Sequence, residues 1–149
     1  MSRSKTLEQA YDACTADGMF LPQKSVETAR IRCMLAIAAE DWASINDLKT
    51  KNRWNTIFKL SYDVFHTLAE AFILFDKTKC ANHQCLFAYL CTKHPELVLD
   101  WDFLERFRTK RNGIQYYGET IAKADFKENE VQIALYVKTL RDALEEKTR

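Results

Sequence analysis

Glycine and proline are scarce in this chain, with three glycines and two prolines among 149 residues. All-β folds need these residues in their many turns, so the scarcity disfavours such folds and favours long helices. Hydrophobic residues make up 47% of the chain, too many for a disordered protein and enough for a packed core. We therefore expect a helical protein built as one domain.

The chain also lacks a strong net charge and a long apolar run. A formal net charge of +1 gives no general attraction to nucleic acid or to a membrane surface, so any electrostatic site must be local. No apolar run approaches the roughly 20 residues needed to span a bilayer. The opening residues, MSRSKTLEQAYDAC, do not contain the apolar core of a signal peptide. These absences predict a cytoplasmic protein that does not enter membranes.

The cysteines do not form a standard pattern of metal ligands. The chain has five: Cys14, Cys33, Cys80, Cys85 and Cys91. The segment CANHQCLFAYLCTKH brings three of them near two histidines, but it contains no C-x-x-C pair of the kind that zinc sites use. An odd count without an export signal favours reduced thiols buried on a helix. We expect neither a metal nor another cofactor.

Hydrophobic spacing predicts a lead-in segment followed by a helical bundle. The lead-in covers residues 1–24 and includes a short helix over Thr6–Thr15. The bundle covers residues 25–149, and its first helix has Ser25 as N-cap and runs to about Leu48.

The most apolar segment is WNTIFKLSYDVFHTLAEAFILFDK, residues 54–77. Its apolar residues form two helical stripes, so this helix is expected at the centre of the bundle. Three more helices are expected: one within NHQCLFAYLCTKHP, one from near Asp100, and one from about Lys127 to Glu146. No segment shows the alternation of a strand. The predicted fold class is all-α, an antiparallel up-and-down bundle of four or five helices.

The segment RTKRNGIQYYGE, residues 108–119, combines three cations, an Asn-Gly pair and two adjacent tyrosines. We expect its helix to continue through Gly113, at a cost of about 1 kcal/mol relative to Ala, and to stop at Gly118. Ile114 continues the line of Phe107, which supports an unbroken helix.

Arg111 lies beside the inward stripe of this helix, so its guanidinium needs a negative partner. A carboxylate from the apolar helix, Asp63 or Glu70, would make a structural ion pair, and a bound anion or RNA is the other interpretation. Residues five apart, such as Arg111 and Tyr116, diverge by about 140° on a helix. They would share a site only if the helix distorts or two copies of the chain meet. The other cations spread around the helix, as solvated charges do.

Two segments and the order of the helices resemble the HEPN superfamily of small helical-bundle proteins. LSYDVFHTLAEAFILFDKTKCANHQCLFAYL is similar to the family's two middle helices, and FLERFRTKRNGIQYYGE is similar to its signature helix. The resemblance covers about residues 25–146. It makes Arg111 the signature arginine and Asn112 the polar residue that follows it.

The resemblance implies a homodimer. Active family members cleave RNA without metal at a cleft between two subunits, using the signature arginine and a following histidine. Many members pair with a small nucleotidyltransferase as toxin and antitoxin. In this chain Tyr116 and Tyr117 stand where the histidine is expected, and no histidine follows Arg111. Tyrosine, with a pKa of about 10, is a poor general base near neutral pH. It can still stack on a base or donate a hydrogen bond to phosphate.

We therefore expect a HEPN-like protein that binds RNA, a nucleotide or a partner protein in a regulatory or defence role, without family-type catalysis. A metal-independent endoribonuclease and a purely structural interaction protein are the alternatives. Expected partners are a second copy of the chain, RNA or a nucleotide, and a small nucleotidyltransferase. The site residues are catalytic Arg111, Asn112 and Tyr116; RNA-binding Arg108, Lys110, Arg111 and Tyr117; and supporting Asp63, His66 and Glu70. His66 is a candidate to line the cleft in place of the missing histidine.

Overall fold

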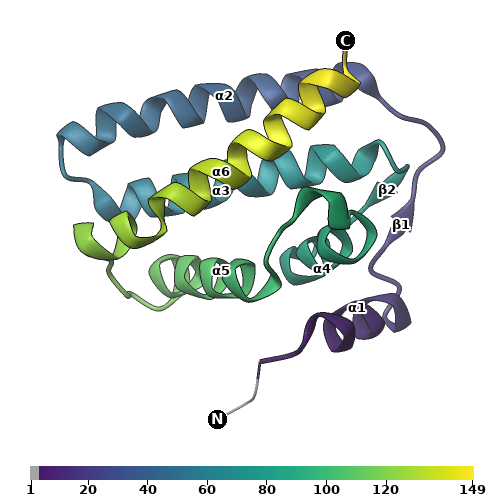
Figure 1. Ribbon diagram of the computed structural model, residues 1–149, viewed down its shortest axis with the longest axis horizontal. Helices are drawn as coiled ribbons and strands as arrows, with labels where there is room; N and C mark the ends of the chain where they lie inside the picture. The colour runs from purple at the N-terminus through teal and green to yellow at the C-terminus, as the bar shows by residue number, and fades with distance from the viewer. Residues whose placement is uncertain (1–3) are drawn as a thin grey trace.

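The computed structural model describes residues 4–149, and this part of the chain is mostly helical (Figure 1). Its α-helices are α1 Leu7–Ala16, α2 Thr28–Thr50, α3 Trp54–Leu74, α4 His83–Lys93, α5 Trp101–Tyr116 and α6 Lys123–Lys147. A 3₁₀ turn, η1 Pro95–Leu97, lies between α4 and α5. The all-α prediction is confirmed in this coarse form. The described residues form six helices, one more than the four or five predicted for the bundle, because α1 lies in the predicted lead-in.

The structure also contains a small two-stranded sheet, so the prediction that no strands would form is wrong. Strands β1 Leu21–Pro22 and β2 Thr78–Lys79 pair in antiparallel register, with Leu21 opposite Lys79. Two residues per strand are too few to show an alternating pattern, so the sequence carried no signal for them.

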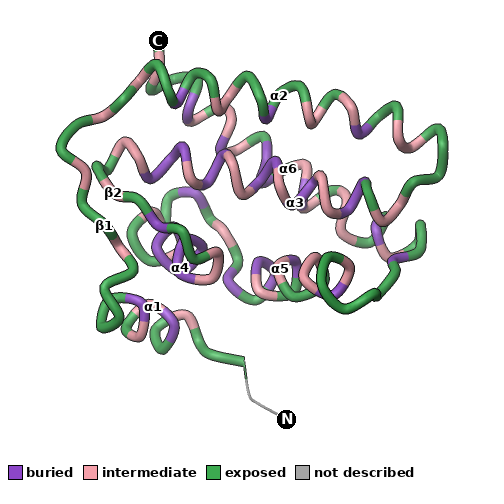
Figure 2. The backbone as a smooth tube through the Cα atoms, turned by 180° about the vertical axis from the view of Figure 1, so that it is seen from behind, coloured by how far each residue is buried: buried purple, intermediate pink, exposed green. Residues whose placement is uncertain are grey.

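Helix α3 is central, as its two apolar stripes predict. It contacts α2, α4, α5 and α6, and about half of its residues are buried (Figure 2). α2 and α3 form an antiparallel pair joined by a short turn, and α6 crosses α3 on the same side of the molecule (Figure 1). α4 and α5 pack against α3 from the other side. The side chains where α3, α4 and α5 meet form the candidate site.

Side-chain caps fix where α4 and α5 begin. The Cys85 N–H donates to Asn82 Oδ1 at 3.0 Å, and the Phe103 N–H donates to Asp100 Oδ2 at 3.3 Å. The start near Asp100 was predicted and is confirmed. The prediction of Ser25 as the cap of α2 is wrong, because α2 begins at Thr28 without a side-chain cap.

Helix α5 runs through Gly113, as the sequence predicts, and ends at Tyr116, two residues before the predicted stop at Gly118. Gly113 is buried, and a Cβ at this position would collide with the Glu119 carboxylate, which folds back over the helix. Gly118 has φ +67°, a left-handed conformation that favours glycine, and it reverses the chain toward α6. The glycine inside the helix therefore makes room for the connection that follows.

A disulfide between Cys14 and Cys85 joins α1 to α4, with the two Cα atoms 5.6 Å apart. The expectation of reduced thiols is wrong for these two cysteines, because their proximity depends on packing that a separation of 71 residues does not reveal. Cys33, Cys80 and Cys91 are free thiols. The Trp101 indole N–H also donates to the Lys5 carbonyl at 3.1 Å, so the lead-in is held at a second point.

Within residues 4–149, no helix combines the length and the apolar character needed to cross a bilayer.

Candidate functional site

Helices α3, α4 and α5 bring together a cluster of polar side chains over the aromatic core. We call this cluster the seam. It consists of Tyr62, Asp63 and His66 from α3, His83 from α4, and Arg108 and Arg111 from α5. Each helix buries an apolar face beside these residues, so the packing of three separate helices determines their positions.

Arg111 makes the ion pair that the sequence suggests. Its Nη2 lies 3.4 Å from Asp63 Oδ1, and its side chain is only 14% exposed. Glu70, the other carboxylate considered, makes no ion pair with Arg111. Burial raises the pKa of the Asp63 carboxyl, and the Arg111 charge opposes that shift. The pair is therefore long and half exposed, and it does not saturate the guanidinium.

The Arg111 guanidinium lies between two tyrosine rings. Its central carbon is 5.2 Å from the ring centre of Tyr62 and 5.8 Å from that of Tyr116. Arg111 Nη1 also donates a weak hydrogen bond to Asn112 Oδ1 at 3.4 Å. The expectation that Arg111 and Tyr116 diverge too far to share a site within one helix is wrong, because the long arginine side chain reaches back to the ring.

Arg111 Nε is buried and has no hydrogen-bond partner in the part of the chain that the structure describes. A buried N–H of a charged group without a partner loses free energy that an acceptor would restore. The Arg111 guanidinium is therefore incompletely satisfied within the described part of the chain.

His66 and His83 stack face to face beside this arginine. Their ring centres are 3.8 Å apart with 29° between the ring planes, and the Tyr62 hydroxyl lies 2.9 Å from His83 Nδ1. Burial lowers the pKa of His66 to about 3, helped by His83 and Arg111. Burial, Arg111 and Arg108 also lower the pKa of His83. Both imidazoles are neutral at neutral pH.

His66 also lies near Glu70, as their spacing of four residues predicts. His66 Nε2 is 3.3 Å from Glu70 Oε1, but the geometry is not that of a hydrogen bond, and Nε2 counts as unpartnered. Since His66 is neutral and burial raises the pKa of Glu70, this contact is not a strong ion pair.

Arg108 is held by a carboxylate on its own helix. Its Nε and Nη2 donate to the two carboxylate oxygens of Glu105 at 3.1 and 2.9 Å, and Gln84 from α4 donates to the same carboxylate at 2.8 Å. The side chain is 22% exposed. Arg108 therefore contributes a positive field at the seam, with part of its charge already compensated.

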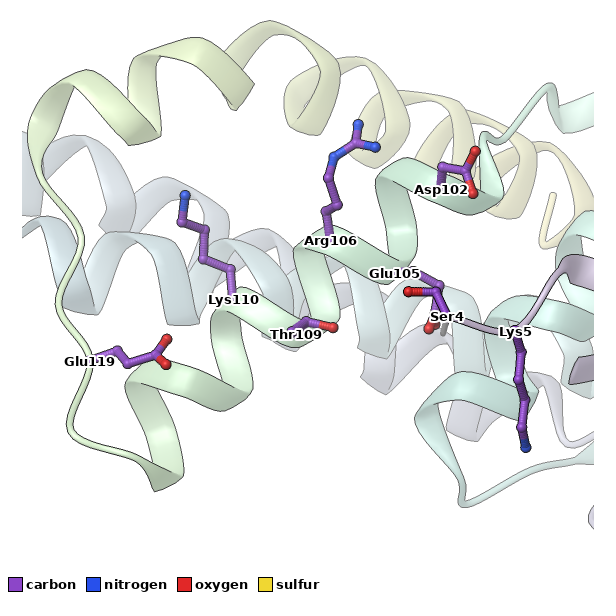
Figure 3. A pocket seen from close by; sticks show the side chains of 8 residues that line it. All are labelled: Ser4, Lys5, Asp102, Glu105, Arg106, Thr109, Lys110 and Glu119. Carbon is purple, nitrogen blue, oxygen red and sulfur yellow. The ribbon is translucent and has the colours of Figure 1, made fainter. Parts of the chain in front are cut away.

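Lys110 lies outside the seam. It lines a cavity of about 550 Å³ along α5, together with Arg106 and Glu119, and Figure 3 shows both cations rising from the same side of the helix. Asp102 and Glu105 also line this cavity, so its charge is mixed. Tyr117 follows the end of α5, is 77% exposed and lies 6.5 Å from Tyr116 between ring centres. The predicted RNA-binding residues therefore occupy two sides of α5.

Sequence reasoning missed Tyr62 and His83 as site residues. Tyr62 is fully buried and forms the floor of the seam, where it contacts both histidines and Arg111. Its position in an apolar stripe correctly placed it in the core but gave no sign of the polar groups above it. His83 is the first residue of α4, directly after the Asn82 cap. Its position at the start of a capped helix, where side chains are often accessible, was the only sequence feature that could have indicated a site residue.

Among residues 4–149, no group of three or more His, Cys, Asp or Glu side chains has the geometry to hold a metal ion. The seam instead offers guanidinium donors, imidazole nitrogens and aromatic faces. These groups suit an anion such as a phosphate, with an aromatic base stacked nearby.

The chain matches no family model, no curated protein and no solved structure.

Proposed function

We propose that the protein binds single-stranded RNA or a nucleotide at the seam, as a HEPN-like module with a regulatory or defence role. The observation that carries the proposal is the Arg111 guanidinium, which is mostly buried, lies near the rings of Tyr62 and Tyr116, and has only a long contact with Asp63. A phosphate oxygen would accept from the terminal nitrogens of the guanidinium, whose contacts with Asp63 and Asn112 are long at 3.4 Å.

The exposed tyrosines support a ligand with aromatic bases. Tyr116 and Tyr117 are 65% and 77% exposed at the end of α5, and the Tyr116 ring lies near Arg111. Stacking of a base on an aromatic side chain contributes about 1–3 kcal/mol. A nucleotide whose phosphate lies at Arg111 would have a ring available for its base.

The test is a titration of a labelled single-stranded RNA against wild type and Arg111→Ala at two salt concentrations. We expect Arg111→Ala to weaken binding at least tenfold, because charge-assisted hydrogen bonds contribute about 1.5–3 kcal/mol. The slope of log affinity against log salt should fall by about 0.7 for one lost phosphate contact.

Arg32→Ala is the matched control, because Arg32 lies on α2 and donates to the Thr148 carbonyl rather than facing the seam. Binding that is absent in wild type, or equal in wild type and Arg111→Ala, contradicts the proposal. Unchanged binding with a lower melting temperature would favour the structural role, in which Arg111 serves only its pair with Asp63.

A second candidate function, metal-independent ribonuclease activity, is favoured by one observation. The stacked His66 and His83 lie at the same seam as Arg111, whereas Tyr116 and Tyr117 occupy the end of the signature helix. Incubation of RNA with the protein and a chelator tests it. Intact RNA after long incubation would reject the ribonuclease hypothesis, and binding without cleavage would remain as the proposed function.

The resemblance also implies a homodimer and a small nucleotidyltransferase partner. The exposed Tyr116 and Tyr117 are positioned to contribute to a contact between two copies as well as to base stacking. Light scattering of the purified chain would test the dimer, and a monomeric mass across a wide concentration range would rule it out.

A further inference from the structure

The stacked histidines of the seam hold no charge in the free protein at neutral pH, because burial and the two nearby arginines both oppose their protonation. We propose that binding of an RNA phosphate at Arg111 is coupled to the uptake of one proton from the solvent buffer, and that His83 of the imidazole pair takes up this proton. The inference rests on the proposed function, because it concerns the same anion site.

The first step is the capacity of the pair for a proton. The two ring centres are 3.8 Å apart, so two positive imidazoles would repel each other strongly, and the pair accepts one proton at most. In the free protein the nearby charges of Arg108 and Arg111 also oppose protonation of His83. The two imidazoles are therefore neutral in the free protein, and whether one of them takes up a proton depends on the charges around them.

The second step assigns the proton to His83. His83 Nδ1 is bonded to the Tyr62 hydroxyl, which can donate to a neutral imidazole or accept from a protonated one. The bond survives protonation, and the Nε2–H of His83 remains free to donate to an anion. His66 is more deeply buried, and its Nε2 has no hydrogen-bond partner among the described residues, so a charge there would be less well solvated.

The third step is the effect of the ligand. A phosphate that contacts Arg111 adds negative charge beside the imidazoles and offsets the field of the two arginines. This change raises the pKa of His83 in the complex relative to the free protein. Because the complex binds more protons than the free protein, affinity must rise as pH falls through the range where histidine titrates.

Three other titratable side chains lie near the histidines, and each must be considered as an alternative site for the proton. Tyr62 already carries its proton, since burial raises its pKa. Glu70 is flanked by Arg30 from α2 and by Lys79. Asp63 is the competitor, because an anion at Arg111 would also raise the pKa of its carboxyl. The experiment must therefore separate His83 from Asp63.

The experiment is calorimetry of the full chain with an eight-residue oligouridylate that has no terminal phosphate, so the ligand does not titrate near neutral pH. Titrations at about pH 6.5 in two non-phosphate buffers of different ionisation enthalpy give the number of protons taken up. We expect net proton uptake of at most one proton per chain in wild type, and affinity that falls by no more than about tenfold per pH unit as pH rises.

The variants locate the proton. His83→Gln should bind the oligonucleotide with little uptake and a nearly flat pH dependence, whereas Asp63→Asn should retain the uptake. His94→Gln is the matched control, because His94 lies outside the seam, where it contacts Asp76 and Glu96. Imidazole NMR signals of wild type, with and without the oligonucleotide, report protonation of His83 even if a variant fails to fold.

The outcomes separate the two proposals. Wild-type binding without proton uptake overturns this inference and leaves the proposed function intact. Uptake that persists in His83→Gln and disappears in Asp63→Asn also overturns it. No binding of the oligonucleotide at any pH overturns the proposed function and this inference with it.

Discussion

At the scale of single residues, the seam is defined by polar groups whose partners are missing or weak. Arg111 has a 3.4 Å contact with Asp63 and an unpartnered Nε, and His66 Nε2 lacks a hydrogen bond although it lies near Glu70. Buried polar groups of a stable core are usually satisfied. Their concentration in one place is the reason for assigning the site here rather than to the cavity along α5.

The low pKa of His66 predicts an acid-sensitive fold. His66 stays neutral in the folded protein down to about pH 3, whereas an unfolded histidine protonates near pH 6.5. Between these values the unfolded state binds more protons, so stability is complete above about pH 6.5 and falls as pH decreases, by at most about 1.4 kcal/mol per pH unit. Urea denaturation at several pH values should show a smaller decrease in His66→Gln than in wild type. Identical pH dependence in both would contradict this assignment.

Gly113 allows a second prediction at this scale. Gly113→Ala gains about 1 kcal/mol of helix propensity but forces the Glu119 carboxylate to move. We expect little net change in wild type and a stabilisation of about 1 kcal/mol when the same substitution is made in Glu119→Ala. Denaturant midpoints of the four proteins give the comparison. Equal effects in both backgrounds would show that Glu119 does not restrict this position.

At the scale of elements, hydrophobic periodicity predicted where the helices lie, but it did not predict which helices contact one another. The two apolar stripes of residues 54–77 correctly predicted that α3 is central, and the line from Phe107 to Ile114 correctly carried α5 through Gly113. The Ser25 cap was wrong, since a suitable residue type near a helix start does not determine which residue caps it. The disulfide was missed because it depends on α1 lying against α4.

The disulfide predicts that α1 depends on an oxidised bond. Cys14→Ser, or reduction of wild type, should lower the free energy of unfolding by about 2–4 kcal/mol, because the bond closes a long loop. Proteolysis within residues 4–20 should accelerate at the same time. Cys33→Ser is the control, because Cys33 is an exposed free thiol on α2. Unchanged stability and unchanged cleavage in Cys14→Ser would contradict the role assigned to the bond.

At the scale of the whole molecule, the site is a product of three helices that are separate in the sequence. Asp63 and Glu70 were the two predicted partners of Arg111, because a buried charge needs a counter-charge, and the structure pairs Arg111 with Asp63. Tyr62 and His83 were not identified, because only the packing of α3 against α4 brings them beside Arg111. Sequence patterns give the faces of helices, whereas the distances between those faces come from the assembled core.

The most direct test of phosphate binding at the seam is NMR observation of the Arg111 Nε–H during titration with oligouridylate. If phosphate binds there, this signal and the His83 ring signals shift together and saturate, because both side chains lie at the binding site. Arg106 and Lys110, on the cavity side of α5, should shift much less. Shifts confined to Arg106 and Lys110, with Arg111 and His83 unchanged, would contradict the assignment of the site to the seam.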